Sequence, residues 1–252
     1  MDDSLKCFNK NYLGISTVLR KDFNKEEFEN YARNAEKTYG VHLPQDKNAW
    51  VADVGCGQGH FLYYLIKKGF CNICGVDIAP DQVEFCRKHV TENVECADFT
   101  KWIPGKSFDV IVMNELLEHI PKQNIVPTIK LAYEGLSDKG IFIVKVPNMR
   151  NPFNLATRYI DFTHEVGFTE NSLYQVLRMA GFDASIYPDG YERKKHLWLH
   201  PKALVKRLVR RLVLIVLRYC FEIANVHPVS GKPLNLFSKR IVAVARKGVE
   251  TE

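Results

Sequence analysis

The chain has 252 residues, of which 46% are hydrophobic and 25% are charged, and its formal net charge is +6. This balance is typical of a globular protein large enough for one α/β domain with additions, and it argues against a disordered or fibrous chain. The acidic, polar start predicts no secretory signal peptide, and seven scattered cysteines predict buried, reduced thiols rather than a disulfide framework.

The first predicted element is an amphipathic helix that follows Asn24. Asn24 is a suitable N-cap because its side chain can accept hydrogen bonds from the first helical turn. Apolar side chains then recur on one face, at Phe28, Tyr31, Ala32 and Ala35. We interpret residues 1–48 as an N-terminal helical lid over a ligand site.

Strand and helix patterns alternate through residues 49–187, which we take as the core domain. Strands are predicted near 51–54, 73–77, 94–97, 109–113, 141–146 and 182–187, with helices near 58–68, 80–89, 122–135 and 170–180. A closing strand is predicted at 240–246, within a last segment that spans residues 240–252. Such alternation predicts right-handed crossovers and a mostly parallel sheet.

The turn after the first strand carries the strongest local signal. Gly55, Gly57 and Gly59 follow Asp53 in the spacing G-x-G-x-G, which lets backbone N–H groups approach a ligand at the start of the next helix. Asp77 ends the second strand about 20 residues later, where a carboxylate can accept both hydroxyls of a ribose. A dinucleotide site uses G-x-G-x-x-G to seat a pyrophosphate, so the present spacing favours a different nucleotide cofactor.

This turn resembles motif I of the class I S-adenosylmethionine-dependent methyltransferases, and residues 93–99, 107–119 and 136–148 resemble later motifs in the same order. The resemblance covers roughly residues 45–187 and the closing strand. It implies a Rossmann-like, doubly wound seven-stranded sheet whose last strand is antiparallel between the fifth and sixth. It also implies S-adenosylmethionine as cofactor, S-adenosylhomocysteine as product, and a set of cofactor contacts at Asp53, Gly55, Cys56, Gly57, Gly59, Asp77, Ile78, Asp98, Phe99 and Asn114.

Residues 158–169 resemble a D-x-T-H-x-x-x-F-T signature in a methyltransferase subgroup associated with bacterial surface-polysaccharide and sugar-nucleotide pathways. His164 is the first candidate for the general base and His119 the second, because an imidazole that titrates at about 6.5 can take a hydroxyl proton. Asp161 or Glu165 could hold the tautomer of His164. Substrate contact without proton transfer and a purely structural role are the alternatives for His164.

Acceptor binding is assigned to three residues of the same segment. Arg158 and Tyr159 could contact an anionic acceptor, Arg158 by a two-pronged contact, and Asp161 completes the set. No metal site is predicted, because Cys71-x-x-Cys74 has no second ligand pair and the other histidines show no ligand spacing.

A basic insertion is predicted at residues 188–239. Residues 193–218 contain nine Lys or Arg and no Asp or Glu, and the apolar run at 212–217 is far shorter than the roughly 20 residues that span a bilayer. Three interpretations stay open: an amphipathic helix on an anionic membrane face, a patch for an acidic substrate, and a helix packed on its own core or on a dimer mate. We favour the third.

We therefore expect an O-methyltransferase that acts on a sugar, glycan or phosphorylated intermediate of a bacterial surface-polysaccharide pathway. An RNA or protein methyltransferase and a non-enzymatic binding module are the alternatives. Nucleic acid is not an expected partner, because Asn114-Glu115-Leu116-Leu117 lacks the turn that stacks a flipped base. A cytoplasmic location, peripheral contact with the inner membrane face and a homodimer are further expectations.

Overall fold

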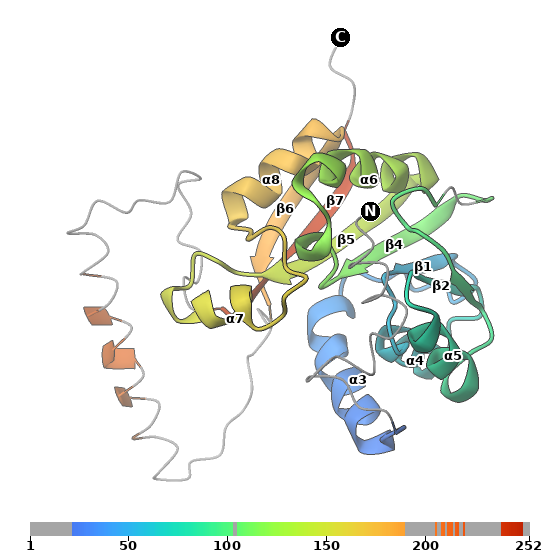
Figure 1. Cartoon of the computed structure of the whole chain (residues 1–252), viewed down its shortest axis with the longest axis horizontal. Helices are drawn as coiled ribbons and strands as arrows, with labels where there is room; N and C mark the ends of the chain where they lie inside the picture. Colours follow the sequence, from blue (N-terminus) through green and yellow to red (C-terminus); the bar gives the residue numbers. More distant parts are fainter. Residues whose placement is uncertain are drawn as a thin grey trace.

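The computed structural model describes residues 22–102, 105–189 and 238–248, and nine separate positions between 205 and 219. The three long segments form a sheet with helices on both of its faces (Figure 1). Seven strands make up this sheet, in the order β3-β2-β1-β4-β5-β7-β6. The predicted fold class is confirmed.

The strand bounds agree closely with the predicted ones. They are β1 (Val51–Val54), β2 (Ile73–Asp77), β3 (Val94–Cys96), β4 (Phe108–Asn114), β5 (Leu136–Pro147), β6 (Phe182–Pro188) and β7 (Arg240–Lys247). The strands β1 to β5 pair in parallel, whereas β7 is antiparallel to both β5 and β6, as the family resemblance implied. The strand β5 begins five residues earlier than expected, because Leu136 already pairs with Phe108 before a register shift.

The longer helices are α3 (Lys25–Tyr39), α4 (His60–Lys67), α5 (Pro80–His89), α6 (Lys122–Gly135) and α8 (Glu170–Met179). Short helices occur at η1 (Leu117–His119), η2 (Pro152–Asn154) and α7 (Leu155–Tyr159). Asn24 caps α3 as predicted, since its side chain accepts hydrogen bonds from the N–H groups of Glu26 and Glu27. Thr169 and Ser172 form a capping box at the start of α8.

The sheet separates two apolar cores. Successive residues of β4 alternate between them: Val110 and Val112 pack with α3, α4 and α5, while Ile111 and Met113 pack with α6 and α8. This alternation is the period of two that places neighbouring strand residues on opposite faces. Because both faces are covered, the strands are almost continuously apolar.

Helix α3 packs against α4. Phe28 stacks on His60 with ring centroids 4.0 Å apart, and the hydroxyls of Tyr63 and Tyr64 donate hydrogen bonds to Glu29 and Glu36. These contacts fix one end of the N-terminal segment on the core. Its role as a lid and the predicted domain boundaries stay predictions.

The connections run outward in opposite directions from β1 and β4, which are neighbours in the sheet. In doubly wound sheets, a crevice for ligands forms at such a point, at the carboxyl ends of the strands. The glycine turn follows β1 and Asn114 ends β4 at this crevice.

Most of the predicted basic helix lies outside the described residues. The apolar side chains that are described there are exposed by 47% to 67%, at Val205, Leu208, Val209, Leu212, Val213, Ile215, Val216 and Tyr219. At these positions the segment does not pack on the core of its own chain. Among the described residues, no helix combines the length and the hydropathy that crossing a bilayer demands.

Candidate active site

The three glycines of the turn have different surroundings. All have positive φ angles, 76° at Gly55, 51° at Gly57 and 83° at Gly59. A Cβ at Gly59 would lie 2.4 Å from the sulfur of Cys86, and one at Gly55 would lie 2.8 Å from Leu116. At Gly57 the nearest atom would be 3.7 Å away. Packing therefore disfavours a side chain at Gly55 and Gly59, whereas a Cβ at Gly57 would make only an ordinary contact with Gln82.

Asp77 holds the same turn from the end of β2. Its carboxylate accepts a hydrogen bond from the N–H of Gly57 at 2.8 Å and one from the N–H of Ala79 at 2.9 Å. A carboxylate has roughly four acceptor positions, so further hydrogen bonds to a ligand are possible. Burial raises the pKa of Asp77 above its usual range, although these hydrogen bonds oppose the shift.

Asp53 is a buried carboxylate with an unsatisfied oxygen. It is 2% exposed, and no described residue hydrogen-bonds its Oδ1 atom. Burial and the charge of Asp77 raise its pKa to about 8, against the opposing effect of Lys145. Buried acceptors without a partner are rare in proteins, so a donor or cation from a ligand is the expected complement.

The adenine-side residues predicted from the sequence lie beyond β3. Asp98 accepts hydrogen bonds from the N–H and the hydroxyl of Thr100, at 3.0 and 2.6 Å. Phe99 is half-buried and packs against the core that includes α6 and α8. Ile78 is half-buried after β2, and Cys56 is buried in the turn, where a hydrogen bond with Cys86 and burial raise the pKa of its thiol.

Two tyrosines of α3 reach the end of β4. Asn114 donates a hydrogen bond to the Tyr31 hydroxyl at 2.7 Å and accepts one from the Tyr39 hydroxyl at 3.0 Å. Lys145 lies nearby, with its Nζ 5.4 Å from the centroid of the Tyr39 ring, and burial lowers its pKa. The sequence analysis missed Lys145, although a lysine near the end of the apolar strand β5 was a usable signal.

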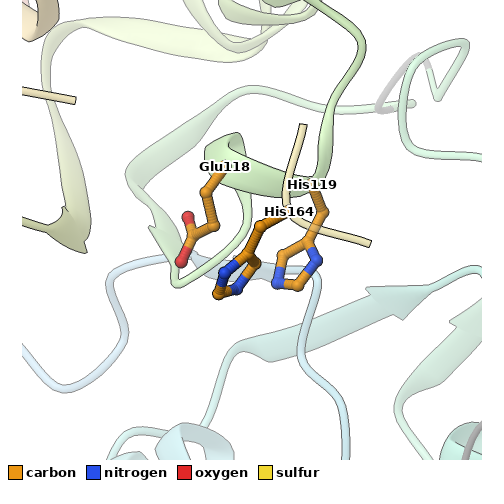
Figure 2. Close-up of side chains that lie close together, drawn as sticks. All are labelled: Glu118, His119 and His164. Atoms are coloured by element: carbon orange, nitrogen blue, oxygen red, sulfur yellow. The ribbon is translucent and has the colours of Figure 1, made fainter. Parts of the chain in front are cut away.

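The predicted catalytic histidines lie together. His119 ends η1 and His164 lies in the loop after α7, and their ring centroids are 4.6 Å apart (Figure 2). Burial and the proximity of His164 lower the pKa of His119 to about 4. His119 is therefore neutral at neutral pH.

The tautomer of each imidazole follows from its hydrogen bond. The Nδ1 of His164 lies 2.9 Å from the main-chain oxygen of Thr157, which can only accept, so Nδ1 carries the proton. The Nδ1 of His119 lies 2.7 Å from the hydroxyl of Thr163, which itself donates to Asp161 at 2.7 Å, so this Nδ1 also carries the proton. In the neutral form of each ring, Nε2 is then the atom that carries the lone pair.

The sequence analysis allowed Asp161 to hold the tautomer of His164, but Asp161 does not do so. The main-chain oxygen of Thr157 has that role, and Asp161 acts instead on His119 through the hydroxyl of Thr163. Glu165 contributes through its main chain, since its N–H donates to the main-chain oxygen of Glu118 at 2.7 Å.

Two of the residues predicted to contact the acceptor, Arg158 and Tyr159, differ in their contacts with the rest of the protein. Arg158 donates hydrogen bonds to the main-chain oxygens of His164 and Glu165, so its guanidinium supports the loop that carries His164. Tyr159 is 80% exposed. On the other side of the cluster, Glu115 has a φ of 54° and accepts a hydrogen bond from Arg240 of β7 at 2.7 Å.

Comparisons with known proteins identify the family of the chain. A family profile described as a methyltransferase domain matches residues 21–185. Trans-aconitate 2-methyltransferase of Rhodopseudomonas palustris is 24% identical over 139 residues, which are 54% of either chain. Phosphoethanolamine N-methyltransferase 3 of Arabidopsis thaliana is 26% identical over 148 residues, 55% of this chain and 30% of that protein. The chain thus spans about half, or less, of the length of these curated relatives.

Solved structures show the same fold. A SAM-dependent methyltransferase from Archaeoglobus fulgidus superimposes with a TM-score of 0.61 and 22% identity over 88% of this chain and 97% of that one. The plantazolicin methyltransferase BpumL in complex with SAH gives a TM-score of 0.57 and 16% identity over 98% and 91% of the two chains.

Proposed function

The chain belongs to the methyltransferase domain family matched at residues 21–185, and from this premise we propose that it transfers a methyl group from S-adenosylmethionine to a hydroxyl of a small-molecule acceptor. The observation that carries the proposal is a pair of neighbouring imidazoles, each oriented by a hydrogen bond at its Nδ1.

The residues of the crevice fit the cofactor. The unsatisfied oxygen of Asp53 suits the ammonium group of the methionine end, and the remaining acceptor positions of Asp77 suit the ribose hydroxyls. The lack of a side chain at Gly57 lets the ligand approach the backbone closely. Asp98 and Phe99 are assigned to the adenine ring. When bound, S-adenosylmethionine supplies a methyl group on a sulfonium centre.

The protein's task is then to position the acceptor oxygen and to remove its proton. A pKa of about 4 makes His119 a weak base near neutral pH, which favours His164 as the proton acceptor. Arg158 supports this assignment by fixing the main chain of the His164 loop, while Tyr159 is exposed and free to contact an acceptor.

For the acceptor we propose a sugar, a glycan or a phosphorylated intermediate of a surface-polysaccharide pathway. The support is the D-x-T-H segment, whose Asp161, Thr163 and His164 form one hydrogen-bonded loop around the imidazole pair. The curated relatives are named for small molecules, which agrees with a small acceptor but names none for this chain. RNA or protein methylation, a homodimer and contact with an anionic membrane are secondary proposals that rest on the basic insertion.

The test is methyl transfer from labelled S-adenosylmethionine to a panel of glycosyl and phosphorylated acceptors. His164→Ala should lower kcat by a factor of about 10² to 10⁴ and leave cofactor affinity unchanged, because its imidazole interacts with Thr157 and His119, neither of which is assigned to the cofactor. His89→Gln, at the far end of α5, is the matched control. Unchanged turnover in His164→Ala would contradict its role as base, and binding of a nicotinamide dinucleotide without S-adenosylmethionine would overturn the function.

A further inference from the structure

Glu118, His119 and His164 form a cluster of potential metal ligands. One ligand atom from each residue can be chosen so that all three lie within 4.8 Å of one another. Figure 2 shows the His164 ring between the Glu118 carboxylate and the His119 ring, with the three side chains directed to the same side.

Among the described residues, the Glu118 carboxylate has no hydrogen-bonding partner. Glu118 is 2% exposed, and neither oxygen of its carboxylate receives a hydrogen bond from any described residue. A buried carboxylate is costly unless it is paired or coordinates a metal. The nearby acid Glu115 is already bound to Arg240, whereas Glu118 is directed into the imidazole pair.

The two imidazoles are prepared as ligands. Each donates its Nδ1–H to a fixed oxygen, His164 to the Thr157 main chain and His119 to Thr163, so that each Nε2 lone pair is available. Metal-binding histidines almost always donate their other ring N–H to a carbonyl, carboxylate or similar acceptor, which orients the ring and increases ligand basicity. Asp161 completes such a chain behind Thr163.

We propose that Glu118, His119 and His164 bind one divalent first-row transition-metal ion. Two imidazoles and one carboxylate favour Zn²⁺, Co²⁺ or Fe²⁺ over Mg²⁺ and Ca²⁺, which prefer oxygen ligands. Three protein ligands leave at least one coordination position for water or an acceptor hydroxyl. Metal–ligand distances of about 2.0–2.2 Å require ligand atoms roughly 3–4 Å apart, so small rotations of the side chains would close the set around the ion.

The site deepens the proposed function and rests on it in one respect, the entry of the acceptor at the histidine pair. A bound ion would take both Nε2 lone pairs and would lower the pKa of a coordinated acceptor hydroxyl, so water would receive the hydroxyl proton and the ion would replace the free-base role given to His164 above. The alkoxide oxygen then bonds to the methyl carbon as the carbon–sulfur bond breaks and its electron pair stays on sulfur. The imidazoles would act through the ion rather than as free bases.

Binding of Co²⁺ alone, without cofactor or acceptor, tests the site. Its visible absorption reports nitrogen and oxygen ligands, and a near-ultraviolet charge-transfer band would reveal thiolate ligands from the scattered cysteines. We expect one Co²⁺ per chain without that band, and at least about 100-fold weaker binding in Glu118→Gln and His164→Ala. Thr163→Val should weaken binding about 10- to 100-fold, because the His119 ring loses its oriented partner. His89→Gln should bind Co²⁺ as the wild type does.

Absence of Co²⁺ binding in the folded wild type, or binding that Glu118→Gln and Thr163→Val leave unchanged, would overturn the metal site. Melting curves establish that each variant is folded. If Co²⁺ does not bind while methyl transfer from S-adenosylmethionine proceeds in the presence of a chelator, the metal proposal fails and the proposed function stands. If Co²⁺ binds but no methyl transfer occurs with any acceptor, the reverse holds.

Discussion

A Cβ at Gly57 should block the cofactor without a comparable loss of fold stability. Gly57 and Gly69 both have left-handed φ angles, 51° and 82°, so alanine carries a backbone penalty of about 1–2 kcal/mol at either position. A Cβ at Gly69 would meet no atom within 4 Å, and one at Gly57 would meet none nearer than 3.7 Å. The free energy of unfolding should therefore fall by a similar amount in Gly57→Ala and Gly69→Ala.

Cofactor affinity should separate the two variants. If the ligand approaches the backbone at Gly57, the new methyl group displaces it and weakens one or two hydrogen bonds, at about 1–1.5 kcal/mol each. This corresponds to a Kd for S-adenosylhomocysteine that is about 10 to 100 times higher. Gly69 follows α4 at the end opposite the glycine turn, so Gly69→Ala should bind with the wild-type Kd.

Urea unfolding and titration calorimetry measure the two quantities. Gly59→Ala is a third variant, in which overlap with the Cys86 sulfur at 2.4 Å should add to the backbone penalty and reduce stability further than Gly69→Ala. Wild-type affinity in Gly57→Ala would refute the assignment of this space to the cofactor. Equal losses of affinity in Gly57→Ala and Gly69→Ala would show that binding merely follows stability.

The charge of Asp53 and the basic insertion give two further predictions. Because the pKa of Asp53 is about 8 in the folded chain and near 4 in the unfolded chain, wild-type stability should fall relative to Asp53→Asn as pH rises between these values, by up to about 1.4 kcal/mol per pH unit. Urea unfolding of both proteins from about pH 5 to about pH 8 checks this, and a constant difference would contradict it. If the insertion lies on an anionic membrane face, which its exposed apolar positions would suit, the protein should sediment with anionic vesicles, at about 1 kcal/mol per basic residue. Binding should be lost on replacement with Gln at Arg207, Arg210 and Arg211, whereas a change of oligomeric state alone would favour a dimer contact.

The strands and most helices could be predicted because their signals are local. Apolar runs define β1, β2 and β4. Helix ends are marked by cap or stop residues that lie at or next to the ends themselves, such as Asn24, Thr169 and Gly181. The helix after the glycine turn begins at His60 rather than near 58, because Gly59 adopts the left-handed conformation and acts as the N-cap. A pattern of residue types alone does not distinguish which glycine of the turn has that role.

The surroundings of the cofactor turn were predictable only in part. Asp53 and Asp77 have the spacing of a nucleotide site, but the unsatisfied oxygen of Asp53 depends on how deeply β1 is buried. Lys145 and Tyr39 come from distant segments and meet at the end of β4 because of the sheet order. Their contact is a consequence of topology, which residue periodicity does not specify.

The cluster of Glu118, His119 and His164 shows most clearly where sequence reasoning ends. His119 and His164 were both candidates, yet no spacing connected them, because metal-ligand patterns are recognised when the ligands share one helix or turn. Here the main-chain oxygen of Glu118 accepts hydrogen bonds from the N–H groups of Glu165 and Val166, and these two bonds hold the His164 loop against η1. Main-chain groups are the same at every position, so this attachment leaves no signature in the side chains. The tautomers likewise depend on a main-chain oxygen for one ring and a threonine hydroxyl for the other. The chemistry of the cluster, by proton transfer or by a bound ion, therefore follows from contacts that only the folded chain creates.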